Sequence, residues 1–455
     1  MADIGDRRPI ALIVLAAGQG TRMNSGLPKP LHRLGGVPLI AHALSAGAAL
    51  DPAKVVVVTG HAAEAVEATV ASLAPGAVCV RQARQLGTGH AVLQAADALD
   101  GFEGDALVLY ADTPFVGAGT LAAMRAARAA HDVVVLGFEA ADPGRYGRLI
   151  LREGRLDRIV EARDATPDER AVTTCNSGLL AADAATMMRL LRTVGTDNAA
   201  GEYYLTDLPA RAAAEGLSAG AVLCEESETL GVNTRAELAA AEAAFQSARR
   251  AAMTEAGVAM QAPETVVFAL DTRIGRDAEV EPHVVFGPGV TVDEGARIRA
   301  FSHLEGCHVS GGAVVGPHAR LRPGAGIGPD ARIGNFVEVK AAAIGAGAKV
   351  NHLSYVGDAA IGAGANLGAG TVTCNYDGVM KHRTVVGEDA FVGSDTMLVA
   401  PVRVGDGAMT ASGSVITEDV PDGALALARA RQVNKPGLAA RLRDRLRAIK
   451  ASKKG

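Results

Sequence analysis

The feature that most constrains the fold is a six-residue period of aliphatic residues in the second half of the chain. A glycine often follows the aliphatic residue, and a small residue such as Ala278 or Ala313 often stands four positions beyond it. This pattern is typical of a left-handed parallel β-helix built from hexapeptide repeats, in which each hexad forms one flat side of a triangular coil. The periodic positions are Ile274, Val280, Phe286, Val292, Ile298, Val309, Val315, Leu321, Ile327, Ile333, Val339, Ile344, Val350, Val356, Ile361, Leu367, Val386, Val392, Leu398, Val404, Thr410 and Ile416.

The period is interrupted over residues 368–385, so we expect this segment to loop out of the coils. Excursions from a regular scaffold are places where binding groups gather. The repeat itself says little about function, because solenoids also serve as scaffolds.

The first half of the chain alternates apolar runs with alanine-rich amphipathic stretches. The runs over 10–16, 55–59, 106–110 and 133–137 predict strands, and the patterns over 39–50 and 120–130 predict helices. Alternating β and α signals favour an α/β Rossmann-like domain with a parallel sheet covered by helices on both faces. Residues 235–252 predict a joining helix. We therefore expect a first domain over 1–234, a linker helix over 235–255, and a β-helix domain with its C-terminal tail over 256–455.

Composition narrows the classes of function. The net charge of −5 gives no reason to expect nucleic acid as a partner. The five cysteines are scattered without metal-site spacing, and no apolar stretch could cross a membrane, so we expect a cytoplasmic protein without disulfides or zinc. The basic tail over 441–454 is interpreted as a frayed, solvated terminus, with attraction of an anionic ligand as the alternative.

A glycine-containing loop follows the first predicted strand, in the run Gly18-Gln19-Gly20-Thr21-Arg22-Met23. Glycines at the end of a strand let backbone N–H groups approach phosphate oxygens, and Arg22 and Lys29 supply the positive charge that a triphosphate needs. A dinucleotide fingerprint would need a third glycine where Met23 stands, and no Gly-Lys-Ser/Thr follows, so neither an NAD site nor a Walker loop is predicted.

This loop together with Pro28-Lys29 resembles the signature of sugar-nucleotide pyrophosphorylases, and Gln82 with the run 85–90 resembles the uridine-reading segment of the members that make UDP-N-acetylglucosamine. Asp112 ends a predicted strand, where a carboxylate is well placed to hold a divalent cation. The resemblance implies Mg²⁺ ligation by Asp112 and Asn233, with one or two Mg²⁺ per subunit. It implies nucleotide and sugar binding by Leu15, Ala16, Gly18, Gly20, Arg22, Lys29, Gln82, Gly87, Thr88, Tyr110, Gly147, Glu161, Asn176 and Asn233.

Two features of the first half stay open. The family often has glycine where this chain has Ala111, which slightly crowds the backbone beside the nucleotide without abolishing binding. The run 201–207 also fits the family, with a structural role and a role in the site as equal alternatives.

Polar residues gather in certain coils of the second half, at Arg322 and over 335–340, 351–358 and 374–378. Their arrangement is similar to the acetyltransferase half of the family of bifunctional N-acetylglucosamine-1-phosphate uridylyltransferases/glucosamine-1-phosphate N-acetyltransferases, and the resemblance spans about Leu12 to Arg431. It implies His352 as general base and sugar-phosphate binding by Arg322 and Lys340. It further implies substrate or acetyl-CoA contacts for Tyr355, Asn366, Ala369, Asn375, Tyr376, Ser394, Ser412 and Arg429, with Ser412 standing where the family commonly has alanine.

Chemistry supports His352 independently of the resemblance. An amine that attacks acetyl-CoA must lose a proton, and a group that titrates near neutrality is its natural acceptor. Backbone N–H groups of the coil could stabilise the oxyanion of the tetrahedral intermediate. Cys374 as an acyl carrier is the rival chemistry, but direct attack on a thioester needs no such intermediate.

The resemblance implies a homotrimeric enzyme with acetyl sites between subunits. It would acetylate glucosamine-1-phosphate with acetyl-CoA and then transfer UMP from UTP to N-acetylglucosamine-1-phosphate, supplying peptidoglycan and lipopolysaccharide precursors. Two alternatives remain: a single-activity sugar-nucleotide pyrophosphorylase whose β-helix only regulates or oligomerises, and a non-enzymatic scaffold with a degenerate nucleotide fold. The polar cluster around His352 argues against the first, and Arg22, Lys29, Asp112 and Asn233 argue against the second.

Overall fold

The computed structural model describes residues 8–152 and 155–453, and its contacts divide the chain into two compact units. The first unit contains the chain up to Ala251 together with Phe268–Leu270, and the second contains Ala252–Val267 and the chain from Asp271 onward. Within the described ranges, no helix combines the length and the apolar character needed to cross a membrane.

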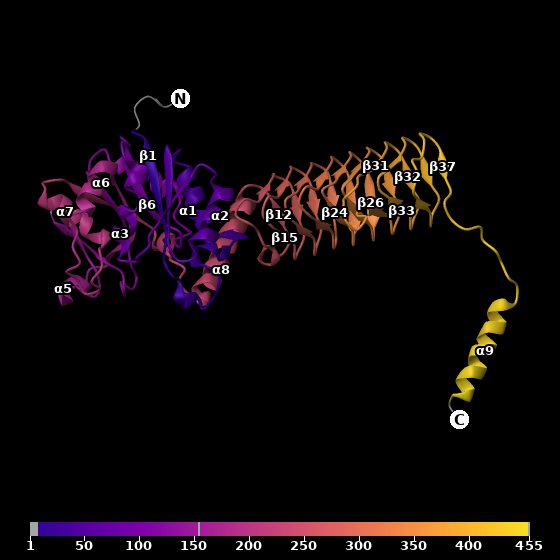
Figure 1. Ribbon diagram of the computed structural model, residues 1–455, viewed down its shortest axis with the longest axis horizontal. Coiled ribbons are helices and arrows are strands. Elements are labelled where there is room, and N and C mark those ends of the chain that lie inside the picture. The colour runs from indigo at the N-terminus through magenta and orange to yellow at the C-terminus, as the bar shows by residue number, and fades with distance from the viewer. Residues whose placement is uncertain (1–7, 153–154, 454–455) are drawn as a thin grey trace. The chain divides into compact units, whose positions relative to one another are not determined.

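The first unit is built on a nine-stranded sheet whose main path runs β11-β7-β10-β6-β1-β4-β5. Figure 1 shows β1 and β6 of this sheet with helices around them. Strand β1 lies between β4 and β6 and pairs with both in parallel. The predicted strands are confirmed in place and type. The strands of the path are β1 (Ile10–Ala16), β4 (Lys54–Thr59), β5 (Val78–Arg81), β6 (Asp105–Tyr110), β7 (Val133–Glu139), β10 (Thr174–Asp183) and β11 (Ala219–Cys224).

The prediction of an all-parallel sheet is wrong at β10, which runs antiparallel to both β6 and β7. Between β7 and β10 the chain forms a hairpin of β8 (Arg148–Arg152) and β9 (Arg155–Val160). It then re-enters the sheet beside the end of β7, where Thr174 lies opposite Glu139. Because no crossover carries the chain back to the start of β7, β10 must run in the reverse direction.

Helices cover both faces of the sheet, and β1 shows why its sequence is continuously apolar. Alternate side chains point to opposite faces, so Leu12 and Val14 join one core while Ile13 and Leu15 join the other. Helices α1 (Leu39–Ala48), α2 (Ala63–Leu73) and α4 (Ala118–Ala127) pack on the first core, and α3 (Thr88–Leu93), α6 (Ala184–Leu191) and α7 (Leu208–Ala214) pack on the second.

Helix α8 (Arg235–Glu255) contains the run over 235–252 that predicts a joining helix and covers the residues expected for the linker helix. Ala241 and Phe245 are buried against Leu34, Leu39 and Val232. These positions lie four residues apart, which places them on one face of a helix. The helix therefore belongs to the first unit up to Ala251 and contributes Ala241 and Phe245 to its core.

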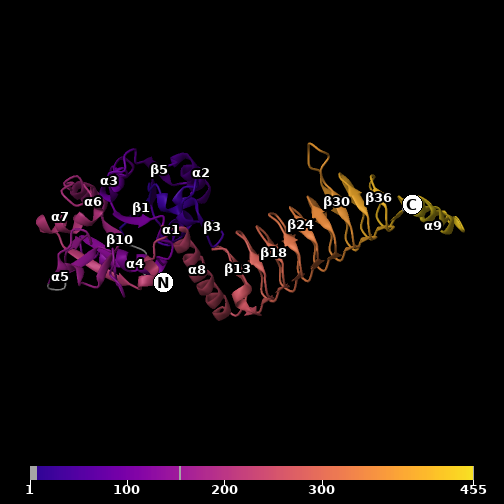
Figure 2. The ribbon, with the colours of Figure 1, turned by 90° about the horizontal axis from the view of Figure 1, so that it is seen from below.

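The second unit is a left-handed parallel β-helix with three flat faces, each a sheet of parallel strands (Figure 2). We name the faces after three neighbouring strands: β26 (Lys349–His352), β27 (Tyr355–Gly357) and β28 (Ala359–Ile361). The β26 face runs from β12 (Ala259–Met260) to β37 (Leu425–Ala426), the β27 face from β15 (Val285–Phe286) to β36 (Val415–Ile416), and the β28 face from β13 (Arg273–Ile274) to β34 (Val402–Val404). With Ile274 as the half-buried exception, the predicted periodic residues are buried inside the coils.

At each corner of the triangle one residue takes a left-handed backbone conformation with positive φ. The second corner, between the β27 and β28 faces, uses Gly289, Gly306, Gly324, Ala341 and Asp358. The third, between the β28 and β26 faces, uses Asp277, Gly295, Gly312, Asp330, Gly347, Gly364, Asp389, Gly407 and Gly423. The first, between the β26 and β27 faces, differs in character and uses Ala262, His283, Phe301, His318, Phe336, Leu353, Gly370, Asp395 and Gly413.

The predicted break over 368–385 is too wide. Strand β30 (Val372–Cys374) continues the β27 face, and Thr373 takes the inward position six residues after Leu367. The Thr373 hydroxyl is satisfied by the Gly357 backbone, from whose N–H it accepts at 2.8 Å. The excursion is confined to residues 375–383, because β31 (Thr384–Val386) resumes the coil beside β28 (Figure 2).

The basic tail is helical rather than frayed. Helix α9 (Leu438–Ser452) is capped by Gly437 in a left-handed conformation, and none of its residues is buried. The prediction of solvation agrees with this exposure, while Lys454 of the predicted tail lies outside the described residues.

Candidate functional site

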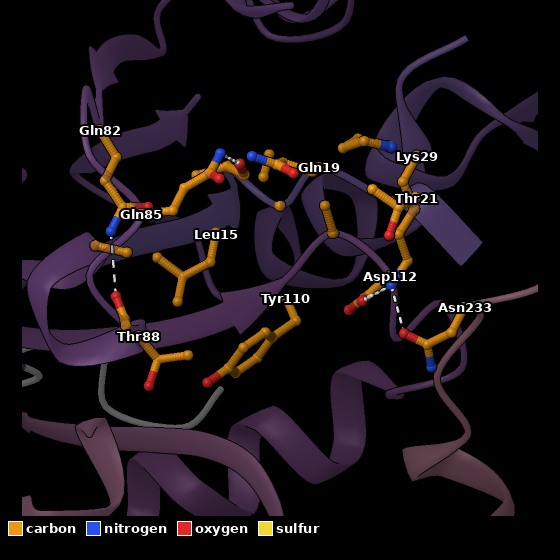
Figure 3. A pocket seen from close by; sticks show the side chains of 18 of the residues that line it. Leu15, Gln19, Thr21, Lys29, Gln82, Gln85, Thr88, Tyr110, Asp112 and Asn233 are labelled. Atoms are coloured by element: carbon orange, nitrogen blue, oxygen red, sulfur yellow. Dashed lines mark hydrogen bonds and ion pairs between the residues drawn. The ribbon is translucent and has the colours of Figure 1, made fainter. Parts of the chain in front are cut away.

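A cavity of about 580 Å³ opens at the carboxyl ends of β1, β5 and β6 (Figure 3). Ligand sites in open α/β sheets form at this edge, because the loops that follow the strands converge there. The structure brings most of the predicted nucleotide-site residues into this one cavity. Those lining it are Leu15, Ala16, Gly18, Gly20, Arg22, Lys29, Gln82, Gly87, Thr88, Tyr110, Asp112 and Asn233.

One end of the cavity gathers charge. The Lys29 ammonium donates to the Asp112 carboxylate and, at 2.7 Å, to the Asn233 side-chain oxygen (Figure 3). The Arg22 guanidinium donates to the same Asn233 oxygen at 2.9 Å. Asp112 and Asn233 thus present oxygen atoms to a single cationic position. A carboxylate and an amide oxygen fit Mg²⁺, which binds proteins through few oxygen ligands and shares the rest with phosphates and water.

The other end offers amide groups. Gln82 donates to the Gly87 carbonyl at 3.1 Å, and Gln85 donates to the Ala17 carbonyl at 2.8 Å, which ties the glycine loop to the segment after β5. Gly20 has a φ of 61°, and a Cβ there would lie 2.6 Å from the Lys29 Cβ. Gly20 therefore allows Lys29 to pass close beneath the loop.

Gly147, Glu161 and Asn176 form a second cluster beside this cavity. The Asn176 N–H donates to the Gly147 carbonyl at 2.8 Å, and a Cβ on Gly147 would lie 3.6 Å from a Glu161 carboxylate oxygen. Tyr110 lines the cavity, and burial, with the charges of Asp112 and Glu161, raises its pKa. The negative charge of Glu161 therefore acts on a side chain that lines the cavity.

The run 201–207 has a structural role in this part of the molecule. The Tyr203 carbonyl accepts from the Gly89 N–H at 2.8 Å, and the Leu205 N–H donates to the Thr88 hydroxyl at 3.1 Å. Thr206 donates to the Glu161 carboxylate at 3.0 Å, and Glu202 lines the cavity. The segment therefore holds the Gly87–Thr88 turn and contributes one residue to the cavity wall.

Replacing Glu161 with glutamine should stabilise the free protein at pH 8 and have less effect at pH 5. Burial raises the pKa of Glu161, so its ionised form is costly in the folded chain. That cost is absent below the ordinary carboxyl pKa, grows as pH rises from the ordinary to the raised pKa, and is constant above it. Melting temperatures of both proteins at the two pH values measure it. Glu169→Gln is the opposite control, because hydrogen bonds from Thr166 hold the pKa of Glu169 low. If the Glu161→Gln protein melts at a lower temperature than wild type at pH 8, the ionised Glu161 carboxylate does not destabilise the folded chain.

In the second unit, His352 ends strand β26 and is exposed next to the first corner. Its Nδ1 lies 2.8 Å from the side-chain oxygen of Asn335, which is its direct neighbour in the parallel register of β23 (Arg332–Asn335) and β26. An amide oxygen only accepts hydrogen bonds, so Nδ1 carries the proton and Nε2 keeps its lone pair. This is the tautomer that a general base needs.

The neighbouring β27 face carries a polar network. Arg322 donates to Glu338 at 2.8 Å, and Asn375 donates to Asp358 and lies 3.5 Å from the Tyr355 hydroxyl. The Lys340 ammonium lies 4.0 Å from Asp358. Lys381 stands close to Lys340, whose ammonium lowers the pKa of Lys381. The Asp358 carboxylate lies beside both ammonium groups and partly offsets their repulsion.

The predicted acetyl-CoA residues lie mostly in one row along the first corner. Backbone N–H groups of the next coil donate to Ala369 at 2.7 Å and to Ser394 at 2.8 Å, and Arg429 donates to the Ser412 carbonyl at 2.8 Å. Two of them stand apart: Asn375 lies in the polar network beside Asp358 and Tyr355, and Tyr376 is exposed in the excursion, where its hydroxyl donates to the Gly378 carbonyl. Asn366, predicted for the acetyltransferase substrate, lies in the β26 face between Lys349 and Phe391.

Cys374 is half-buried, and burial raises the pKa of its thiol. A raised pKa leaves less thiolate, which is the nucleophilic form. The environment of Cys374 therefore does not favour the acyl-carrier chemistry.

Sequence reasoning did not select Asn335, Glu338, Asp358, Lys381 or Gln85 as site residues. Three of them lie inside the polar runs of the second half: Asn335, Glu338 and Asp358. Their position one coil away from a predicted site residue is the sequence feature that could have identified them. Gln85 stands in the uridine-reading motif. Lys381 carries no such signal, because the chain brings it to Lys340 only through the excursion.

Comparison with known proteins shows which proteins this chain is similar to along its length. Residues 12–188 match the model of the MobA-like NTP transferase domain. The chain is 70% identical to the bifunctional protein GlmU of Jannaschia sp. (strain CCS1) over 446 residues, which cover 98% of both proteins. It is 64% identical to bifunctional protein GlmU of Paracoccus denitrificans, over 98% of this chain and 99% of the relative. It is 66% identical to bifunctional protein GlmU of Dinoroseobacter shibae, with the same coverage.

Proposed function

Because the chain belongs to the family of bifunctional GlmU proteins, we propose that each of its two units carries one reaction, with the residue roles given below. The chain is a bifunctional enzyme of UDP-N-acetylglucosamine synthesis, a glucosamine-1-phosphate acetyltransferase and an N-acetylglucosamine-1-phosphate uridylyltransferase. The proposed division puts uridylyl transfer in residues 1–234 and acetyl transfer in residues 256–455, on either side of α8.

In the first unit, the sugar phosphate attacks the α-phosphorus of UTP and pyrophosphate leaves. No protein nucleophile is needed, so the residues must gather the reactants and neutralise their charge. Gln82, Gly87 and Thr88 would receive the uridine, and Gly147, Glu161 and Asn176 the sugar. Arg22, Lys29 and the amides of the loop over 18–20 would bind the phosphates. This order is supported by the cavity, whose amide end and cationic end are separated as the two ends of a nucleotide are.

Asp112 and Asn233 would hold Mg²⁺. When bound, the ion supplies positive charge to the reacting phosphates and lowers their mutual repulsion. The Lys29 ammonium contacts a side-chain oxygen of both Asp112 and Asn233. These two oxygen atoms therefore already lie around one cationic group, as ligands of an ion would. An ion at these ligands would leave the Lys29 ammonium available to a phosphate oxygen.

In the second unit, His352 Nε2 would take the proton that the amino group of glucosamine-1-phosphate loses as it attacks the thioester carbon of acetyl-CoA. The bond from nitrogen to the acetyl carbon forms, the bond from carbon to sulfur breaks, and the departing CoA sulfur takes up the proton that His352 accepted, so CoA is released as its thiol. Arg322, Lys340 and Lys381 would bind the sugar phosphate. Tyr355 and Asn366 would orient the sugar. The residues that would contact acetyl-CoA are Ala369, Asn375, Tyr376, Ser394, Ser412 and Arg429.

Asn335 would set the tautomer of His352. Replacing Asn335 with aspartate keeps an acceptor at Nδ1 but adds a negative charge that favours the protonated ring. The acid limb of the pH–rate profile for acetyl transfer should therefore move to higher pH. Asn335→Ala should lower kcat about tenfold, the rate equivalent of one hydrogen bond worth about 1.4 kcal/mol. Uridylyl transfer is the control in both proteins, and identical pH profiles for wild type and Asn335→Asp would exclude Asn335 from the mechanism.

We also propose a homotrimer with acetyl sites between subunits. Two observations support it. His352 and Arg429 are exposed on a single chain, and Asn366 lies on a different face from Arg322 and Tyr355. Another subunit could close such an open site from the side.

The single observation that carries the assignment of both reactions to this chain is its similarity to bifunctional relatives over nearly the whole length. The test is to incubate the protein with glucosamine-1-phosphate, acetyl-CoA, UTP and Mg²⁺ and to follow thiol and pyrophosphate separately. We expect thiol release without UTP, and pyrophosphate release only after acetylation or with supplied N-acetylglucosamine-1-phosphate. Pyrophosphate without any thiol would support the single-activity alternative.

A further inference from the structure

Helix α9, the last helix of the chain, carries its large apolar residues along one side (Figure 1). We call them the apolar stripe, which consists of Leu438, Leu442, Leu446 and Ile449. They follow one another at intervals of four, four and three residues, and residues at these intervals are neighbours on a helix surface. Leu442, Leu446 and Ile449 have relative exposures of 50%, 64% and 43%. The rest of the described chain therefore leaves the apolar stripe open.

Basic residues border the apolar stripe on both sides. With about 100° between successive residues of an α-helix, Arg441 and Arg445 follow one edge of the stripe. Arg443 and Lys450 follow the other edge. Long arginine and lysine side chains lay their methylene groups along an apolar surface and extend their charged ends to its polar boundary. This side of α9 is therefore apolar in the middle and cationic along both edges.

The positive charge of the chain is concentrated in this short segment. Residues 438–453 contain six basic residues and one acidic residue, a net charge of +5, so the rest of the chain carries −10. The acidic residue, Asp444, pairs with Arg447 at 3.5 Å, on the side of the helix away from the apolar stripe. Such a separation of charge within one chain indicates an anionic partner for its basic segment.

We infer that α9 binds the surface of an anionic lipid bilayer and lies in the plane of that surface. The apolar stripe enters the boundary between headgroups and acyl chains, and the basic residues on its two edges reach the lipid phosphates. An amphipathic helix with a basic polar face binds membranes in this way, through buried apolar area together with attraction to anionic lipids. This inference goes beyond the two proposed reactions and depends on neither of them.

Other anionic or apolar partners use only half of this surface. Nucleic acid would attract the basic residues through its phosphates but would leave the apolar stripe in contact with water. A second copy of α9 would cover the stripe, but it would bring arginines of one helix against arginines of the other. Helices that pair along an apolar stripe normally carry opposite charges at these flanking positions. An anionic bilayer satisfies the stripe and the charge at the same time.

The first test is co-sedimentation of the full-length protein with vesicles. One set is made of phosphatidylcholine alone, and the other of equal parts phosphatidylcholine and phosphatidylglycerol. Each basic residue near an anionic surface strengthens binding about fivefold, so we expect the protein to bind the mixed vesicles at least about tenfold more tightly. Added salt should release it, because salt screens the attraction. Equal binding to both sets of vesicles, or no binding to the mixed set, overturns the inference.

The second test separates the apolar stripe from the charge. The double variant Leu442→Gln, Leu446→Gln keeps every basic residue, and glutamine forms helices nearly as well as leucine. We expect its binding to the mixed vesicles to fall about tenfold or more, because two buried leucines are lost from the contact. The matched control is Ala440→Gln, Ala451→Gln, which puts the same side chains on the opposite side of α9 and should bind as wild type does.

None of these four positions is buried, so circular dichroism of both double variants should match wild type. If the two double variants bind the mixed vesicles equally well, the apolar stripe is not the membrane contact and the inference is wrong.

The other two partners are tested directly. The mixed vesicles should displace the protein from duplex DNA of mixed sequence at equal phosphate concentration. Without lipid, wild type and the Leu442→Gln, Leu446→Gln variant should sediment at the same rate. A preference for DNA would replace the bilayer with nucleic acid. A change of oligomeric state on loss of the apolar stripe would replace it with a second copy of the chain.

Discussion

Replacing Asp112 with asparagine should lower uridylyl transfer by about a hundredfold or more, the scale of losing a major electrostatic contact at a reacting centre. The substitution keeps the shape of the side chain but removes the charge that holds the Lys29 ammonium and would hold Mg²⁺. Pyrophosphate release from UTP and N-acetylglucosamine-1-phosphate is the measurement. Acetyl transfer, which we propose for the other unit, should not change.

Glu202 provides the matched control for this experiment. It is a second carboxylate on the wall of the same cavity, outside the cluster of Lys29, Asp112 and Asn233. Glu202→Gln should cost less than tenfold, because it removes a similar charge from the cavity without disturbing the cation position. Equal losses in the two variants, or near-normal pyrophosphate release from Asp112→Asn, would show that Asp112 has no special role.

Replacing His352 with alanine should lower acetyl transfer by roughly 10² to 10⁴, the range expected when a general base is lost. The fold should survive, because His352 is exposed and its imidazole bonds only to the Asn335 side chain among the described contacts. Release of CoA thiol in the presence of glucosamine-1-phosphate is the measurement, with uridylyl transfer as the internal control.

Two further variants make the test of His352 specific. His308→Ala removes another exposed histidine, paired at 2.9 Å with Asp293 on the β28 face, and should leave acetyl transfer unchanged. Cys374→Ala should have only a modest effect. An inactive Cys374→Ala protein, together with a labelled acetyl group trapped on wild type, would show that the acyl-carrier route is the real one.

The β-helix could be predicted because its signal is local and repeated. Each inward residue, such as Val280 or Val315, identifies itself by its spacing to the next, and the packing inside a coil depends on little else. Thr373 shows where that signal fails. It occupies an inward position through hydrogen bonds with the Gly357 backbone, so a search for aliphatic residues passes over it and places the break too early.

The direction of β10 could not be predicted for a different reason. Its buried run from Leu179 to Ala182 is apolar on both faces, and hydropathy is the same whichever way a strand runs. Direction is set by the hairpin of β8 and β9 and by the length of its connections, which are properties of the tertiary fold.

In the candidate sites, too, sequence patterns do not predict which side chains contact each other. Motif matching finds Lys29, Asp112 and Asn233 separately, but their convergence joins positions 83 and 204 residues apart in the chain. The pairing of Asn335 with His352 arises from strand register between coils, and that of Lys340 with Lys381 from the excursion. The site residues could be identified from the sequence, whereas the residues that each of them contacts are known only from the fold.

The number of residues in each coil limits how this protein can change in length during evolution. Val280 pairs with Ile298, Ile298 with Val315, and Val315 with Ile333, so a coil takes 17 or 18 residues. Loss of a single residue within a face would turn every later inward side chain outward until the next corner absorbed it. Insertions and deletions should therefore survive either as whole coils, which lengthen the prism without altering its cross-section, or inside the excursion over 375–383, where added residues leave the stack unbroken.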